Sequence, residues 1–399
     1  MDNKGIEGEK YVNELAFNSY LDYWCYPNPK DELGDKKEIC DLLIIFKETL
    51  IIISVKNYEN KGNYERYKKR VIEKSTNQLY GAERKLFNND REIRIKHHKR
   101  GVEIFDKNAI KNVFRITVNV GEQFEFYELG DVIKNKGFVN IFNKDTFEKI
   151  IQELDTIPDL VNYLLERENL LKHYEQIDFK SKERDLLAIY LRNIRKFPND
   201  YYKDGIEKIT VDLTNAWEDY DKHHRVLKKR EQDKYSYFID KLVKNDILGI
   251  ENGEKLGKEL MSLTRIERRF ISKALLTLIA KHQKNDEIEL ARRYLDFNDN
   301  FGYLFIYYSN KISASKEELD LMIFNIAPSL YSYKTNCKNK YLIVFAGNDY
   351  LKQWKFGLFI PPESPFSSEA VNYYENMIKN LGWFADMNEF RFQVNEYPD

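Results

Sequence analysis

The chain has 399 residues, 42% hydrophobic and 14% aromatic, which is enough apolar material for two or three cores and predicts a multidomain soluble protein. Its 64 basic and 65 acidic residues give a formal net charge of -1, so the charge of the whole chain indicates no polyanion partner. Because no apolar run has the length of a membrane span and the first residues lack a signal-peptide pattern, we expect a cytoplasmic protein with no membrane partner.

The first part of the chain predicts helix, loop and hairpin in that order. Apolar residues at helical spacing over 5–18 indicate an amphipathic helix that carries Glu9. Prolines, a glycine and charges over 26–37 favour a connecting loop. The apolar β-branched runs 39–46 and 50–56, separated by a short polar link, are typical of a buried hairpin.

The rest of the chain divides by the period of its apolar residues. A helix over 64–87 and a strand over 113–120 complete a predicted α/β domain at 1–140. Helical patterns then dominate an all-α domain at 141–297, where Thr156 and Asp159 form an N-cap box. For a small α/β domain at 298–399 we predict strands over 303–309, 340–347 and 355–362, and helices over 317–326 and 368–380.

Two polar residues interrupt the predicted hairpin. Asp41 lies near the start of its first strand, and Lys56 ends the second strand, on the same face as Ser54. If residues 47–50 turn the chain, Asp41 lies opposite Val55 or Lys56, about 5 Å away. Carboxylates that hold a cation and a lysine that positions water suit phosphodiester cleavage. Alternatively, Asp41 caps its strand or pairs with another lysine, and Lys56 merely ends its strand in solvent.

The order of these residues supports the first interpretation. Glu9 on a first helix, Asp41 opening a hairpin, Ser54-Val55-Lys56 closing it and Gln78 on the next helix resemble the core of the PD-(D/E)xK, or restriction-endonuclease-like, nuclease superfamily. The strings KEICDLLIIFKETLIIISVKNY, NQLYGAERKL and ELDTIPDLVNYLLERENLL are also similar to uncharacterised bacterial proteins from restriction-like or phage-defence settings, over about residues 1–175. The resemblance implies an α/β nuclease core with a mixed sheet, DNA as the first choice of substrate, and Mg²⁺ or Mn²⁺ as cofactor.

The site that the resemblance implies departs from the superfamily pattern at one position. Its members usually carry Glu, Asp or Gln two residues before the lysine, where this chain has Ser54, and the bacterial group has an acidic residue at the position of Val55. The implied metal ligands are Glu9, Asp41 and the Val55 carbonyl oxygen, with Glu38 as a replacement carboxylate.

The remaining roles follow from the same resemblance. Lys56 would orient the attacking water, Ser54 would contribute its hydroxyl group, and Gln78 would support the lysine or contact a phosphate. Two simpler interpretations stay open. In the first, Glu9 near a helix start interacts favourably with the helix dipole without any metal. In the second, Gln78 is simply an exposed helix residue.

Basic residues beside the predicted site suit phosphate binding, and tyrosines are interleaved with them. The nearest are Arg66, Lys68, Lys69, Arg70 and Lys74, and a second group comprises Arg91, Arg94, Lys96, Lys99 and Arg100. Alternatively, these are a solvated helix face and a mobile loop, because Glu65, Glu73 and Glu92 lower the local charge. Two functions stay open: a Mg²⁺-dependent endonuclease in restriction or phage defence, and a catalytically inactive module that binds nucleic acid, a partner protein or a second copy.

Overall fold

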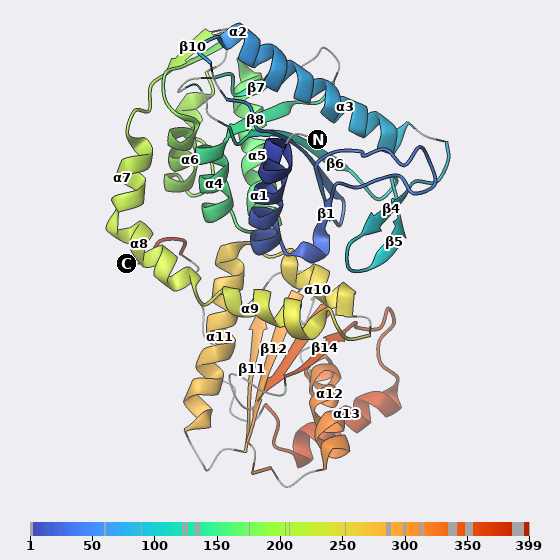
Figure 1. Ribbon diagram of the computed structural model, residues 1–399. Helices are drawn as coiled ribbons and strands as arrows, with labels where there is room; N and C mark the ends of the chain where they lie inside the picture. Colours follow the sequence, from blue (N-terminus) through green and yellow to red (C-terminus); the bar gives the residue numbers. More distant parts are fainter. Residues whose placement is uncertain are drawn as a thin grey trace. The chain divides into compact units, whose positions relative to one another are not determined.

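The protein is a mixed α/β structure with a six-stranded, curled mixed sheet, a helical middle region and a four-stranded C-terminal sheet (Figure 1). The computed structural model describes residues 3–59, 61–88, 90–121, 124, 127–131, 136–174, 176–203, 205–206, 208–251, 253–284, 289–297, 301–309, 311–312, 315–333, 341–347, 354–384 and 395–398. Over these ranges, no helix combines the length and the apolar character needed to cross a membrane.

The chain forms two compact units. Unit 1 comprises residues 1–231, 262–265 and 396–399, and unit 2 comprises 232–261 and 266–395. The domain boundaries predicted after residues 140 and 297 do not coincide with this grouping, and they stay predictions.

Unit 1 contains the larger sheet, whose strand order is β1-β2-β3-β6-β8-β7. Strand β3 is antiparallel to β2 and parallel to β6, and β6 is parallel to β8. The elements of unit 1 are α1 (Asn3–Tyr20), β1 (Cys25–Pro27), β2 (Leu42–Phe46), β3 (Thr49–Lys56), α2 (Tyr64–Tyr67), a π-helical segment (Lys68–Glu73), α3 (Lys74–Phe87), β4 (Arg94–His97), β5 (Gly101–Ile104), β6 (Asn112–Asn119), β7 (Gly130–Asp131), β8 (Val139–Asn143), α4 (Lys144–Glu153), α5 (Ile157–His173), β9 (Gln176–Phe179), α6 (Glu183–Arg192), β10 (Lys208–Val211), α7 (Ala216–Lys222) and α8 (His224–Asp233, which ends in unit 2).

The centre of this sheet is buried on both faces, because a helix covers each side of β3. Ile52 faces α3 and packs with Leu79 and Leu86 in one apolar cluster. Val55 faces α1, at Gly8. Since successive side chains of a strand point to opposite faces, a strand covered on both sides is apolar at nearly every position, as β3 is.

The predicted helix over 64–87 is confirmed as one helical run, but its middle is π-helical. The buried residues Tyr67, Val71, Ser75 and Leu79 recur every four positions. An α-helix has 3.6 residues per turn, so this spacing would rotate away from the sheet, and wider π turns compensate. Ser75 anchors the run, because its hydroxyl group lies 2.7 Å from that of Thr117 on β6.

Several strands lie where the sequence indicated loop or helix. The charged stretch after α3 forms the β4–β5 hairpin. The predicted all-α middle begins with β8, a full member of the large sheet, and contains the parallel pair β9–β10. These strands are short, so their apolar alternation is too brief to stand out against the helices beside them. The predicted N-cap at Thr156 is confirmed, since its hydroxyl oxygen accepts a 3.2 Å hydrogen bond from the Asp159 N–H.

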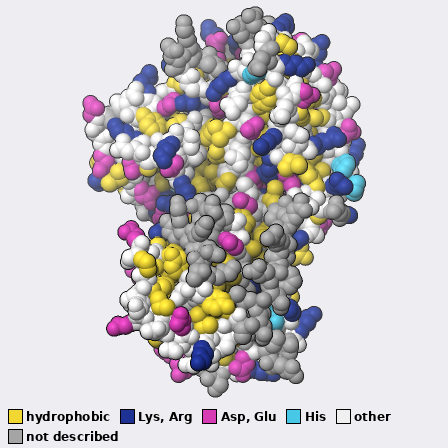
Figure 2. Space-filling model, turned by 180° about the vertical axis from the view of Figure 1, so that it is seen from behind, with side chains coloured by type: hydrophobic (Ala, Val, Ile, Leu, Met, Phe, Trp, Pro, Cys, Tyr) yellow, Lys and Arg dark blue, Asp and Glu magenta, His cyan; other side chains and the backbone are white. Residues whose placement is uncertain are grey.

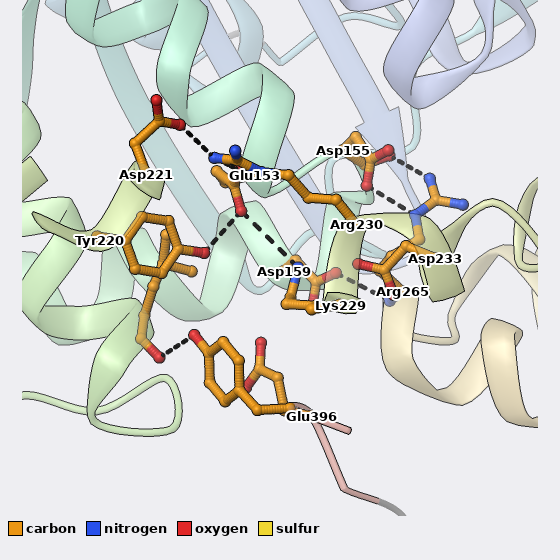
Figure 3. Close-up of polar contacts among 12 residues, drawn as sticks. Glu153, Asp155, Asp159, Tyr220, Asp221, Lys229, Arg230, Asp233, Arg265 and Glu396 are labelled. Carbon is orange, nitrogen blue, oxygen red and sulfur yellow. Dashed lines mark hydrogen bonds and ion pairs between the residues drawn. The ribbon is translucent and has the colours of Figure 1, made fainter. Parts of the chain in front are cut away.

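A buried polar network holds the helical part of unit 1 together. Tyr220, Lys229 and Arg230 point toward the Glu153 carboxylate (Figure 3). The Tyr220 hydroxyl group donates a 2.8 Å hydrogen bond, and Arg230 Nε donates another of 2.8 Å. The carboxylate is almost fully buried, at 5% side-chain exposure. This single acidic group therefore satisfies donors from α7 and α8 at the end of α4.

Unit 2 contains the smaller sheet, with strand order β11-β12-β13-β14. The predicted strands and helices of the C-terminal part are confirmed within a few residues, except that α12 extends further and β11 replaces the end of the predicted helical region. Its elements are α9 (Tyr237–Leu242), a π-helical segment (Val243–Ile247), α10 (Gly253–Met261), α11 (Arg265–Gln283, which begins in unit 1), β11 (Leu290–Asp296), β12 (Phe301–Tyr308), α12 (Lys316–Tyr333), β13 (Tyr341–Gly347), β14 (Lys355–Phe359) and α13 (Ser368–Asn380). Helices α12 and α13 share an apolar core with β12 and β13.

We expect Glu153→Ala to lower the free energy of unfolding by about 3 kcal/mol or more, because it removes the buried carboxylate that Tyr220, Arg230 and the buried Lys229 contact. The matched control is Glu48→Ala, which breaks the exposed ion pair with Lys111 and should cost less than about 1 kcal/mol. Urea denaturation of both variants measures the difference. Equal losses would show that the Glu153 network contributes no more than a surface pair.

Candidate functional site

Asp41 directly precedes β2 at one end of the β2–β3 hairpin. Leu42 pairs with Ile53, so Asp41 lies opposite Ser54 rather than opposite Val55 or Lys56, as the sequence predicted. The register differs because the turn uses only two residues, 47 and 48, instead of four. Asp41 nevertheless reaches across the hairpin, since its carboxylate accepts a hydrogen bond from the Val55 N–H.

Lys56 ends β3 and turns back along its own strand. Its Nζ atom donates hydrogen bonds to Ser54 Oγ at 2.7 Å and to the Val55 carbonyl oxygen at 3.0 Å. Burial lowers the pKa of Lys56, the negative charge of Asp41 opposes that change, and nearby Lys74 adds to it. The structure therefore brings Asp41, Ser54 and Lys56 together. The Val55 carbonyl oxygen, which was predicted as a metal ligand, instead accepts a hydrogen bond from Lys56.

The carboxyl groups of Glu38 and Asp41 are in hydrogen-bond contact, although Glu38 as a whole residue is exposed. Desolvation, the negative charges of Asp41 and Glu9 and the hydrogen bond with Asp41 together raise the pKa of Glu38 to about 7, against the opposing effect of Lys30. Two carboxyl groups this close cannot both ionise without cost, so in the absence of a cation Glu38 keeps its proton to higher pH than a free carboxyl group does. Sequence reasoning gave Glu38 only as a replacement ligand, because its position in a charged loop carries no pattern.

Glu9 approaches this pair from α1. A Cβ atom at the preceding Gly8 would lie 2.8 Å from Val120 Cγ2 and 3.5 Å from Val55 Cγ1, so only glycine lets the helix come this close to the sheet. The Glu9 carboxylate accepts a 3.0 Å hydrogen bond from Asn28 Nδ2. Glu9 is thus within electrostatic range of Glu38 and held by a neutral donor.

Gln78, an exposed residue of α3, lines a cavity of about 450 Å³ beside the hairpin. The lining includes the acidic pair and Ser54, and α3 contributes Gln78, Gly81 and Lys85 along one face. The complete lining is Asp35, Lys37, Glu38, Ile39, Cys40, Asp41, Ser54, Gln78, Leu79, Gly81, Ala82 and Lys85. Lys85 Nζ donates to Asp35 Oδ1 at 2.7 Å and to the Lys37 carbonyl oxygen at 2.9 Å, which fixes the loop before β2 against the helix.

The acidic side chains fit one kind of metal site better than others. Within the described ranges, no group of three or more His, Cys, Asp or Glu side chains is arranged to hold a metal ion. This excludes a preformed protein cage among those residues. Mg²⁺, however, is usually bound by one or two carboxylates together with water and substrate phosphates. Glu38 and Asp41, already in contact, match that donor set.

The first group of predicted phosphate-binding residues lies on the helical run between β3 and β6. Their side chains are exposed apart from Lys68, which is half-buried and forms a 2.8 Å ion pair with Glu128. Lys74 is close enough to affect the charge of Lys56. The group comprises Arg66, Lys68, Lys69, Arg70 and Lys74, of which Lys74 is placed nearest to the site by this electrostatic effect.

We expect the metal-free protein to lose stability relative to Glu38→Gln as the pH rises from about 5 to about 8. In the folded state the pKa of Glu38 is about 7, above the ordinary value of 4.5. The contribution of its protonated form is therefore fully present below pH 4.5 and is lost as the pH rises through 7. Thermal unfolding of both proteins across this range, with Glu48→Gln as control, measures the effect. A difference that does not change with pH would contradict the raised pKa of Glu38.

The candidate site consists of the end of the β2–β3 hairpin, the Glu38–Asp41 carboxyl pair and the half-buried Lys56. Comparisons of the chain with protein families, with curated proteins and with solved structures found no match.

Proposed function

We propose that this chain is a metal-dependent nuclease that hydrolyses phosphodiester bonds, with DNA as the first candidate substrate. One observation carries the proposal: the paired carboxyl groups of Glu38 and Asp41 line the same cavity as Ser54 and Gln78. Lys56 adjoins that cavity through its 2.7 Å hydrogen bond to Ser54. Acidic ligands, a cation and polar groups around one hollow are the components of metal-assisted hydrolysis.

The order of elements supports the same proposal. Helix α1 carries Glu9, the β2–β3 hairpin carries Asp41 and Lys56, and α3 carries Gln78 before the chain returns in parallel as β6. This is the order that the resemblance to PD-(D/E)xK nucleases implies. The similarity of the strings over residues 1–175 extends the proposal to a setting in restriction or phage defence, with a partner protein or a second copy as further candidates.

Each residue has a role in the proposed reaction. Asp41 and Glu38 would hold a Mg²⁺ or Mn²⁺ ion, with Glu9 adding negative charge from outside the pair. The bound ion supplies charge stabilisation at the scissile phosphate and a more acidic water molecule. Lys56 would orient that water and balance the developing negative charge, with Ser54 holding its Nζ atom in place. Gln78 would contact a phosphate at the cavity wall.

A second candidate function is a catalytically inactive module that binds nucleic acid or a partner protein. One contact favours it: the Val55 carbonyl oxygen, a metal ligand in the predicted site, accepts a 3.0 Å hydrogen bond from Lys56. Ser54 also stands where the superfamily usually has an acidic ligand. Both features weaken metal binding and leave the hairpin intact.

We expect the wild-type protein with Mg²⁺ or Mn²⁺ to cleave plasmid DNA, linear DNA or single-stranded RNA, and EDTA to abolish the reaction. Lys56→Met keeps the aliphatic stem but removes the ammonium group, and it should lower the rate by about a hundredfold or more. Asp41→Asn should do the same. The matched control is Lys111→Ala, which removes an exposed lysine that directly precedes β6 and pairs with Glu48 in the turn of the hairpin; this variant should cleave at the wild-type rate.

The outcome separates the two candidate functions. Metal-dependent cleavage that is lost in Lys56→Met and kept in Lys111→Ala supports the nuclease. If no substrate is cleaved but DNA is retarded in a gel, the inactive binding module is correct. Equal cleavage by both lysine variants would remove Lys56 from the reaction and overturn the assigned site.

We also expect Mg²⁺ to bind more tightly as the pH rises. The ion competes with the proton on Glu38, so below pH 7, the approximate pKa of Glu38, the affinity should rise by about tenfold per pH unit. Glu38→Gln should abolish this slope. Isothermal titration calorimetry between about pH 5.5 and 8 measures both. An affinity independent of pH in the wild-type protein would place the ion elsewhere.

A further inference from the structure

We propose that the outward face of the β4–β5 hairpin binds the groove of a nucleic-acid duplex and holds it beside the acidic pair. The hairpin follows α3 and lies on the side of unit 1 away from α6 and α7 (Figure 1). The choice of nucleic acid as partner rests on the proposed function. The binding face itself is defined by the hairpin's own residues.

Four side chains define this face, which we name the ribbon face: Arg94, Lys96, Val102 and Ile104. In the antiparallel register Arg94 pairs with Ile104 and Lys96 pairs with Val102. Directly paired residues point to the same side of a two-stranded ribbon, so two basic and two aliphatic side chains share one surface. Val102 and Ile104 are 52% and 59% exposed, which is unusual for β-branched aliphatic residues on a strand.

The other side of the hairpin is fixed to unit 1. Ile95 and His97 are buried there. His97 Nε2 lies 3.1 Å from the Asp22 carbonyl oxygen, and the Tyr26 hydroxyl group donates a 2.6 Å hydrogen bond to Glu103. Arg100 also bonds to Glu103, at 2.5 Å. The ribbon face is therefore presented by a rigid support and would lose little entropy when it binds.

Backbone pairing links the ribbon to the candidate site. Asp31 forms a β-bridge with Ile95, and the Glu32 N–H donates a 2.8 Å hydrogen bond to the Arg94 carbonyl oxygen. The same loop returns through a bridge between Lys30 and Glu38. The loop that presents the Glu38 carboxyl group is thus bonded along β4. A duplex seated on the ribbon would be held next to that carboxyl group.

The chemistry of the ribbon face selects a duplex over an apolar partner. Arg94 and Lys96 complement phosphate charge, and the Arg94–Glu92 ion pair is exposed on both sides, so it competes weakly. A two-stranded ribbon fits the major groove, where aliphatic side chains contact thymine methyl groups. On the face that Figure 2 shows, acidic and basic side chains are intermixed among the coloured atoms. Attraction of a duplex therefore depends on local basic residues such as Arg94 and Lys96 and not on the net charge of the chain.

The test measures binding of a fluorescent 30-base-pair duplex by anisotropy in EDTA, across a range of salt concentrations. Arg94→Ala/Lys96→Ala should weaken binding by about tenfold and reduce the slope of log K against log salt by about 2, one for each phosphate contact. Val102→Ser/Ile104→Ser should weaken binding by a similar factor and leave the slope unchanged, because it removes groove contacts without charge. Lys111→Ala is the control and should bind as wild type.

Each outcome decides the proposal. Unchanged binding by both double variants, with wild-type circular dichroism, overturns the ribbon face even if the protein cleaves DNA. Loss of binding only in the basic pair overturns groove insertion and reduces the ribbon to a charge contact. Weaker binding by both double variants supports the ribbon face. An absence of cleavage would contradict the proposed nuclease but not the ribbon face.

Discussion

The parallel pairing of β3 with β6 is the constraint on which the rest of unit 1 depends. Two adjacent parallel strands require a long crossover, and here the helical run from α2 to α3 supplies it. The crossover lies on one face of β3 while α1 covers the other, so the middle of β3 is buried on both sides and only its two ends are partly exposed. The polar residues Asp41 and Lys56 therefore lie at an end of the hairpin. The π-helical turns keep α3 aligned, which places Gln78 at the cavity.

The carboxyl pair shows how the site conflicts with stability. The carboxyl groups of Glu38 and Asp41 are in contact, and the pKa of Glu38 rises to about 7 because its carboxyl group is desolvated and lies beside the negative charge of Asp41. A sequence optimised for folding alone would place a neutral or basic residue at one of these positions. Lys56 is desolvated in the same region, and its nearest partners are a hydroxyl group and a carbonyl oxygen rather than a carboxylate. Unfavourable arrangements of this kind concentrate at functional sites.

Much of the fold was predictable because long apolar runs and helical periodicity survive in the sequence. The hairpin, the helical run and α13 all followed from such patterns. The register of the hairpin did not, because it depends on whether the turn uses two residues or four, and residues 47–50 contain no glycine to decide it. The β4–β5 ribbon was missed for a different reason. Its exposed face carries both basic and aliphatic side chains, which erases the alternation that marks a half-buried strand. Glu38 reaches Asp41 only through the fold of its loop.

The last described residues have a consequence for how the protein is made. Arg195 Nε donates a 2.9 Å hydrogen bond to Glu396, and the Tyr397 hydroxyl group donates one of 2.8 Å to the Leu191 carbonyl oxygen, all within unit 1. During synthesis these contacts form only after the whole of unit 2 has left the ribosome. Most of unit 1 therefore leaves the ribosome early, but its contacts with Glu396 and Tyr397 form last. While unit 2 folds, the nascent chain carries unit 1 without these contacts. Chaperone dependence of expression would be a natural result of this arrangement.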